Sequence, residues 1–205
     1  VIVENAPGAG GSIGVQLVLN SQGSTVPVLI ASQTEPILTP LSLASARYKP
    51  EQMRAVGTLG RTSYVLAGRA DMPATTHAQL LDMARQAAAA GKPLTFGHIG
   101  QGSMIHLMGA QWARLCGVPL VHVPYRGVPP VVQDLMGNQI DLSFVPLGGA
   151  ALNMLETGRS RELADPVLRA QIVLDAHQQF VLQPGPQIQR ERVGSALQWT
   201  VCVRV

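Results

Sequence analysis

The chain has 205 residues, enough to bury a core as one large domain or as two small ones. Hydrophobic residues make up 46 %, charged residues 13 % and aromatic residues 4 %, which excludes a disordered or collagen-like chain. The formal net charge is +3 and no basic run stands out, so nucleic-acid binding is not indicated. No apolar stretch reaches the roughly 18–20 residues of a membrane span, and the first residues do not read as a signal peptide.

The first elements of the chain predict a small α/β unit, the first lobe, over residues 1–68. The apolar run VIVE at residues 1–4 indicates a buried strand, and the loop after it leads to a helix for which Ser12 is the expected N-cap. The other elements expected in this lobe are strands at 26–31, 54–59 and 64–67 and a short helix near 37–44.

Helical and strand-like patterns alternate over residues 69–163, the second lobe. Helices separate the strand patterns PLTFGHIG, PLVHVPY and QIDLSFVP, and such alternation implies parallel strands joined by right-handed crossovers. Two α/β halves joined near residues 64–69 predict a two-lobed α/β fold with a cleft between the lobes. The composition changes at about residue 164, and we expect residues 164–205 to form a C-terminal helical segment that packs on the first lobe.

The loop NAPGAGGS opens the pattern G-x-G-x-x-x-G at Gly8, Gly10 and Gly14, which is close to a dinucleotide-binding fingerprint. Glu35 follows the second expected strand, about where a ribose-binding acid would lie. Pro7 lengthens the turn, however, and no site for a hydride acceptor follows. The loop thus has three interpretations: a dinucleotide site, which would make the protein an NAD(P)-binding oxidoreductase, a tight turn, or a loop that lines the site of a small anion.

A second glycine-rich loop, with Gly100, Gly102 and Ser103, precedes the helical pattern SMIHLMGAQWARLC. The N–H groups and the positive dipole end of a helix N-terminus favour anions, so we expect this loop to bind one. Tyr125 and Arg126 end another strand and are expected to face the cleft. Arg126 would offer a fixed positive charge to a carboxylate.

Metal binding and catalysis are the less favoured interpretations. His98 and His106 could ligate a metal, but no nearby carboxylate or third ligand has metal spacing, so we expect no metal and a packed or hydrogen-bonded His106. No nucleophile elbow, zinc-protease motif or P-loop lysine occurs, and capture of a ligand is favoured over an enzyme activity. Cys116 and Cys202 are expected to be buried thiols, and a disulfide between them stays open.

The chain resembles the Bug-type receptors in four blocks that match in order and spacing: VIVENAPGAGGSIG, YKPEQMRAVGTL, TFGHIGQGSMIHLMG and VHVPYRGVPPVVQDLMGNQIDLSFV. These receptors are the extracytoplasmic solute-binding components of tripartite tricarboxylate transporters. The resemblance implies a periplasmic Venus-flytrap protein that closes on a small dicarboxylate, aromatic carboxylate or amino acid. It also implies that the protein needs no cofactor and delivers its solute to membrane transporter subunits.

The resemblance further implies that helix N-termini of both lobes grip one carboxylate, at Ser32–Thr34 in the first lobe and at Gly97–Ser103 in the second. The candidate ligand-binding residues are Ser32, Gln33, Thr34, Gly97, His98, Gly100, Gly102, Ser103, Tyr125, Arg126 and Phe144. Glu35 is unusual at a wall that meets an anion, because like charges repel. We therefore hypothesise a solute with an ammonium group, the alternative being a Glu35 that points to solvent.

The chain departs from the family pattern in three ways. The family normally begins one βα unit earlier, and that unit carries half of the carboxylate grip. After LETGRSRELA the return crossing into the first lobe is absent, and SALQWTVCVRV resembles no family segment. A truncated family remnant that binds no ligand is thus a further alternative.

Overall fold

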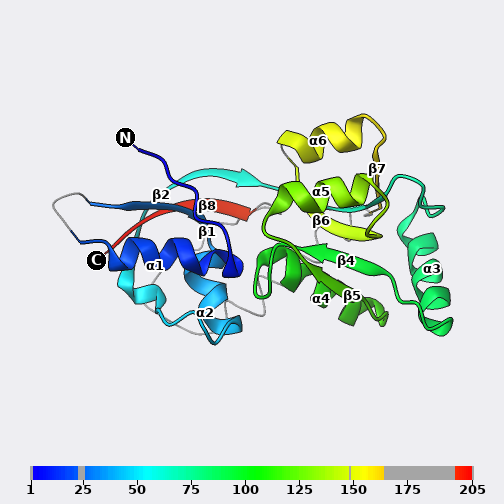
Figure 1. Cartoon of the computed structure of the whole chain (residues 1–205), viewed down its shortest axis with the longest axis horizontal. Helices are drawn as coiled ribbons and strands as arrows, with labels where there is room; N and C mark the ends of the chain where they lie inside the picture. The colour runs from blue at the N-terminus through cyan, green and yellow to red at the C-terminus, as the bar shows by residue number, and fades with distance from the viewer. Residues whose placement is uncertain (1, 23–25, 148, 164–196, 205) are drawn as a thin grey trace.

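The computed structural model describes residues 2–22, 26–147, 149–163 and 197–204. These residues form two lobes side by side, and each lobe is built around its own β-sheet (Figure 1). The predicted two-lobed α/β fold is confirmed.

The first lobe contains a three-stranded antiparallel sheet in the order β1-β8-β2. Its elements are η1 (Ala9–Gly11), α1 (Ser12–Asn20), β1 (Val28–Ser32), the π-helical turn η2 (Thr34–Leu38), α2 (Thr39–Ser42), η3 (Pro50–Gln52), β2 (Met53–Thr62) and β8 (Leu197–Arg204). A small core of Val15, Ala46 and Tyr48 lies under α1. The strand β8 separates β1 from β2 and, among the described strands, is the one that links them.

The second lobe contains a five-stranded mixed sheet in the order β5-β4-β6-β3-β7. Its elements are β3 (Tyr64–Arg69), α3 (His77–Ala89), β4 (Thr95–His98), α4 (Met104–Cys116), β5 (Val121–Pro124), α5 (Val128–Met136), β6 (Leu142–Pro146), α6 (Gly149–Glu156) and β7 (Ser160–Glu162). Strand β4 pairs parallel with β5 and β6, as the alternating pattern predicts, whereas β3 pairs antiparallel with β6 and β7.

Alternating side chains divide the second lobe into two apolar layers. Leu142 and Phe144 of β6 join the cluster around Phe96 and Trp112, while Val145, the residue after Phe144, belongs to the cluster on the opposite face. A strand buried on both faces is what a sheet covered by helices on each side requires. Helix α4 contributes Trp112 and is bounded by local signals, with the Ser103 hydroxyl accepting from the His106 N–H at its start.

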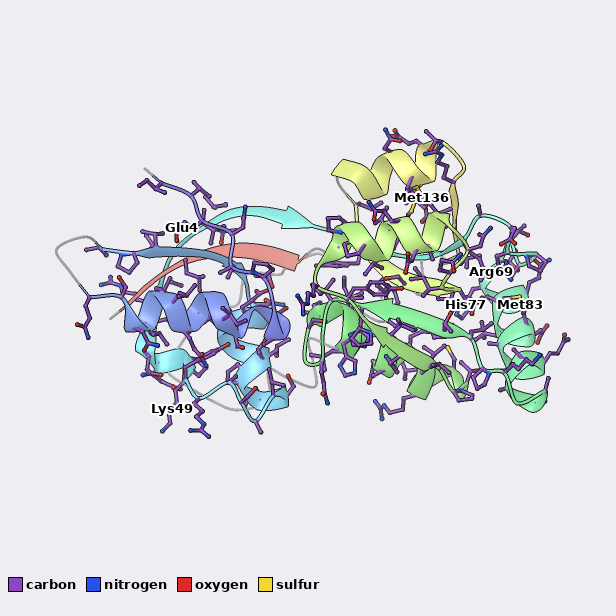
Figure 2. All side chains as sticks on the ribbon, viewed as in Figure 1. Glu4, Lys49, Arg69, His77, Met83 and Met136 are labelled. Carbon is purple, nitrogen blue, oxygen red and sulfur yellow. The ribbon has the colours of Figure 1, made fainter. Side chains whose placement is uncertain are left out.

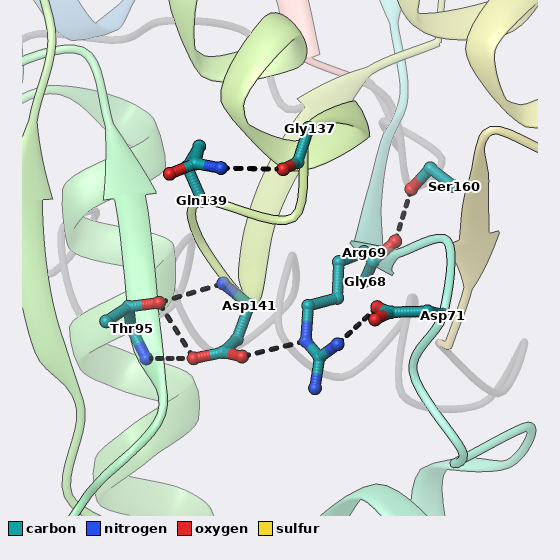
Figure 3. Close-up of polar contacts among 8 residues, drawn as sticks. All are labelled: Gly68, Arg69, Asp71, Thr95, Gly137, Gln139, Asp141 and Ser160. Atoms are coloured by element: carbon teal, nitrogen blue, oxygen red, sulfur yellow. Dashed lines mark hydrogen bonds and ion pairs between the residues drawn. The ribbon is translucent and has the colours of Figure 1, made fainter.

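A polar bridge links β3, β4 and the residue before β6 (Figure 3), at the end of the second lobe that faces away from the first lobe, where Figure 2 labels Arg69. The Asp141 carboxylate accepts hydrogen bonds from the Thr95 N–H and Oγ1, both at 2.8 Å, and from Arg69 Nε at 3.0 Å. Arg69 also pairs with Asp71. Thr95 begins β4 and Arg69 ends β3, so the hydrogen bonds of Asp141 hold β3 and β4 in place at this end of the sheet. The opposite ends of the same two strands approach the first lobe.

Three expectations about elements are wrong. Residues 2–4 form no strand, and the side chains of Ile2 and Val3 are exposed, because no described strand pairs with them. Ser12 is the first residue of α1, and Gly11 is its N-cap. Residues 197–204 form a strand instead of a helix.

The expected lobe boundary also differs from the observed change of sheet. Strand β3 was expected in the first lobe but pairs only with β6 and β7, so the chain changes sheet at Ser63. The helical prediction for residues 164–196 lies outside the described residues. Cys116 is a half-buried free thiol.

Candidate functional site

Loops from the two lobes meet at what we call the lobe junction, formed by Gly10 and Ser42 of the first lobe and Gln101–Ser103 of the second. A Cβ added at Gly10 would lie 3.1 Å from the Gln101 carbonyl oxygen, and Gly10 has a φ of +61°. A Cβ added at Gly102, whose φ is +77°, would lie 2.7 Å from Ser42 Oγ. Glycine at both positions therefore permits the close approach of the two lobes.

The loop expected to bind an anion donates its N–H groups within the second lobe. The Gly100 N–H donates to His98 Nδ1 at 3.2 Å, and the Gly102 N–H donates to His106 Nδ1 at 3.3 Å. The Ser103 N–H donates to the Gly100 carbonyl at 3.2 Å. An incoming carboxylate would therefore have to replace two imidazole nitrogens as the acceptor of these N–H groups.

The first-lobe wall contains one buried hydroxyl without a partner. Ser32 Oγ donates to Glu35 Oε2 at 2.6 Å and accepts from the Thr34 N–H at 3.2 Å. Thr34 is only 1 % exposed, and its Oγ1 makes no hydrogen bond to the described residues. Gln33 between them is half-buried. Since buried hydroxyls are normally hydrogen-bonded, Thr34 Oγ1 is a candidate ligand contact.

Glu35 is half-buried, so the alternative of a solvent-facing carboxylate is wrong. Its side chain lies over the glycine loop, since a Cβ added at Gly11 would come within 2.2 Å of Glu35 Cγ. Burial raises the pKa of Glu35, and the hydrogen bond from Ser32 opposes that rise. Burial, with the Glu35 carboxylate as a second cause, raises the pKa of Tyr64 to about 12, which places Glu35 near the start of β3.

The other predicted site residues are not among those that form the lobe junction, and two of them face the core of the second lobe. Gly97 faces the core, because a Cβ there would lie 2.5 Å from a methyl group of Ile140. Phe144 is 3 % exposed and packs in the core. Tyr125 donates its hydroxyl to a neighbouring carboxylate, whereas Arg126 is exposed and joins none of the ion pairs among the described residues.

His98, His106 and His122 form a histidine cluster, and the sequence interpretation missed His122. Ring centroids lie 4.7 Å apart for His98 and His106, 5.4 Å for His98 and His122, and 5.1 Å for His106 and His122. Burial, and next the neighbouring His106, lower the pKa of His98 to about 4. Burial also lowers the pKa values of His106 and His122. The signal that could have revealed His122 is the register of the parallel strands β4 and β5. His122 pairs with Phe96, and His98 follows Phe96 by two residues on the same strand.

The first glycine loop lacks the context of a dinucleotide fingerprint. Residues 2–8 contain no strand, and the fingerprint requires a strand directly before the first glycine. Glu35, the candidate ribose ligand, packs across Gly11 and accepts a hydrogen bond from Ser32. The geometry thus counts against the oxidoreductase interpretation.

The two sheets and the loops that meet between them define a two-lobed periplasmic-binding-protein fold. Similar solved structures share it: an adipate-bound R. palustris protein has a TM-score of 0.75 at 24 % identity and covers 99 % of this chain and 65 % of its own. MatC of Rhodopseudomonas palustris, solved with bound malate, has a TM-score of 0.71 at 20 % identity and covers 96 % of this chain and 64 % of its own.

Residues 1–171 match the family model of the tripartite tricarboxylate transporter family receptor, and the chain belongs to this family. A UPF0065 protein from the ttuE-ttuC' intergenic region of Agrobacterium vitis is 33 % identical over 147 residues, which is 70 % of this chain and 40 % of the relative. Protein BugT of Bordetella pertussis is 29 % identical over 168 residues, 80 % of this chain and 50 % of the relative.

The chain thus spans half or less of the length of these curated relatives. Among the described residues, no helix combines the length and the apolar character that crossing a membrane requires.

Proposed function

We infer that this protein is a periplasmic receptor that captures a small carboxylate-bearing solute and delivers it to the membrane subunits of a transporter, rather than an enzyme. The observation that carries this proposal is the match of residues 1–171 to the transporter receptor family. Structures of the same fold are bound to adipate and to malate, so small dicarboxylates are the first candidate solutes.

The proposed solute site lies between the first-lobe wall and the loop of the second lobe. The unpartnered Thr34 Oγ1 and the neighbouring Gln33 would contact the solute from one side. The N–H groups of Gly100 and Gly102 would contact it from the other, and the exposed Arg126, which joins none of the ion pairs among the described residues, would supply a positive charge. The solute would stabilise a closed arrangement of the two lobes only through contacts that an open arrangement of the lobes does not offer.

Glu35 supports a finer proposal, that the preferred solute carries an ammonium group as well as a carboxylate. Its half-buried carboxylate accepts from Ser32 and lies near Tyr64 across the change of lobes. An ionised carboxylate there repels a second anion unless a positive group lies between them. An amino acid such as glutamate meets this requirement, whereas adipate does not.

Thermal unfolding of the purified chain with and without solutes tests the proposal. A solute at 100 times its Kd stabilises the folded state by about 2.7 kcal/mol, which raises Tm by roughly 5–10 °C for a chain of this size. We expect this rise with malate, adipate or glutamate and none with NADH. A rise with NADH alone would support the oxidoreductase, and no rise with any of the four would support the non-binding remnant.

Calorimetry with the Glu35→Gln variant tests the finer proposal separately. Removing the negative charge should weaken glutamate binding and strengthen adipate binding. Equal changes for both solutes would refute a role of Glu35 in selection and leave the receptor function standing. Gly57→Ala is the matched control, because a Cβ at Gly57 meets no atom of the described residues within 4 Å.

A further inference from the structure

The histidine cluster brings three imidazole side chains into mutual contact inside the second lobe. One ring nitrogen of each of His98, His106 and His122 lies within 4.8 Å of those of the other two. Among the described residues, no carboxylate or thiol joins the group. The cluster therefore consists of three nitrogen donors of one chemical kind.

Three separate elements place these rings, so the arrangement does not depend on one flexible loop. His98 ends β4, and His122 lies in β5, the parallel neighbour of β4. Phe96 pairs with His122, and His98 follows two residues later on the same face of the sheet. His106 lies in the first turn of α4, which the Ser103 cap fixes over that face.

One ring of the cluster has a buried nitrogen without a partner. His122 Nδ1 is inaccessible to solvent and makes no hydrogen bond to the described residues. Buried polar atoms are normally paired, and an unpaired one indicates a bound group or a functional role. A lone pair of neutral imidazole is also a common ligand of Zn²⁺, Ni²⁺ and Cu²⁺ in proteins.

We propose that His98, His106 and His122 form a binding site for a divalent transition metal ion, with Zn²⁺ as the representative ion. A point equidistant from three atoms 4.8 Å apart lies about 2.8 Å from each, and Zn–N bonds are about 2.0–2.1 Å. Each ring nitrogen thus needs to move inward by less than about 1 Å. Three protein ligands leave the fourth tetrahedral position open to water or another oxygen donor.

Hydrogen bonds to the rings identify the ligand atoms of two histidines. The N–H groups of Gly100 and Gly102 donate to Nδ1 of His98 and His106, which leaves Nε2 of both for the metal. In the metal-free form that Nε2 carries the ring proton. When the metal takes the Nε2 lone pair, the proton moves to Nδ1 through solvent, and the two loop N–H groups lose their acceptors. Metal binding would therefore release the N–H groups of Gly100 and Gly102.

Calorimetric titration of the chelator-treated full chain with Zn²⁺ tests the proposal, without any solute present. We expect one Zn²⁺ per chain, and we expect His122→Gln and His98→Asn each to raise Kd at least tenfold. His77→Gln is the matched control, because His77 lies at the start of α3, away from the first lobe (Figure 2), and is not one of the three described residues that could hold the metal. It should bind Zn²⁺ as the parent chain does.

Nuclear magnetic resonance of the imidazole nitrogens in the unsubstituted chain keeps the test independent of how the variants fold. Zn²⁺ should shift the ring signals of the three cluster histidines and leave those of His77 unchanged. Absence of stoichiometric binding would overturn the proposal and leave ring packing as the role of the cluster. Binding that His122→Gln does not weaken, or shifts confined to other histidines, would overturn it as well.

Discussion

The buried ring of His98 makes the stability of the metal-free protein depend on pH. His98 is 4 % exposed, and its pKa lies at about 4 in the folded chain against about 6.5 in an unfolded one. Between these values the unfolded chain binds more protons, so the free energy of unfolding falls as the pH falls. From pH 7 to pH 5 these two pKa values give a loss of about 2 kcal/mol, or about 1 kcal/mol after allowance for partial screening by solvent.

Titration of Glu35 changes the free energy of unfolding in the opposite direction to that of His98, so its contribution has to be removed from the measurement. Its pKa is raised in the folded chain, so the stability it contributes is present at low pH and is lost as the pH rises. The Glu35→Gln variant eliminates this contribution and isolates the histidines. His106 and His122, whose pKa values are also lowered, add to the loss at low pH in the same direction as His98.

Urea unfolding followed by circular dichroism, with a chelator present, measures the effect. The Glu35→Gln variant should lose at least about 1 kcal/mol from pH 7 to pH 5, and a variant that also carries His98→Asn should lose about 1–2 kcal/mol less than it. Asparagine at this position can still accept a hydrogen bond but does not titrate. If both variants lose the same stability over this range, the assigned burial of His98 is wrong.

Three further substitutions probe packing, the polar bridge and the lobe junction. Gly109→Ala should destabilise the chain by roughly 1–3 kcal/mol in urea unfolding, because a Cβ there would lie 2.3 Å from a buried aromatic ring. The control Gly57→Ala should change the free energy of unfolding by less than about 0.5 kcal/mol. Asp141→Ala removes the acceptor of three hydrogen bonds and should lower Tm by about 4–10 °C in calorimetry, while Asp71→Ala, which removes only an exposed ion pair, should leave Tm nearly unchanged. Gly102→Ala should weaken binding of the solute at least tenfold in calorimetry. The added Cβ would be strained at a positive φ and would meet Ser42 of the first lobe. Unchanged affinity would mean that the solute binds elsewhere.

Local signals were sufficient to predict most of the second lobe. Ser103 as N-cap, Gly117 after the last turn and the apolar spacing between them predicted α4 within a residue, and the alternation of elements predicted the parallel pairing of β4 with β5 and β6. The antiparallel β3 could not be predicted in the same way. Only Ser63 separates it from β2, and no local signal shows that the chain changes sheet there.

The strand β8 and His122 show two different limits of the sequence interpretation. The stretch from Leu197 to Arg204 alternates apolar and polar residues with period two, a strand pattern that the helical expectation for the whole C-terminal segment overrode. His122 has no sequence neighbour that indicates a ligand role. Its contact with His98 follows from the register of two strands, which only the assembled sheet fixes.

The central position of β8 separates the order of folding from the order of the chain. Every strand pairing of the described second lobe lies within residues 64–163, so that lobe can assemble while later residues are still being synthesised. Strands β1 and β2 precede the second lobe in the chain, but the described strand that pairs with both of them lies at residues 197–204, after that lobe. Until β8 is made, the edges of β1 and β2 lack this partner, so these two strands depend on chaperones more than the strands of the second lobe do.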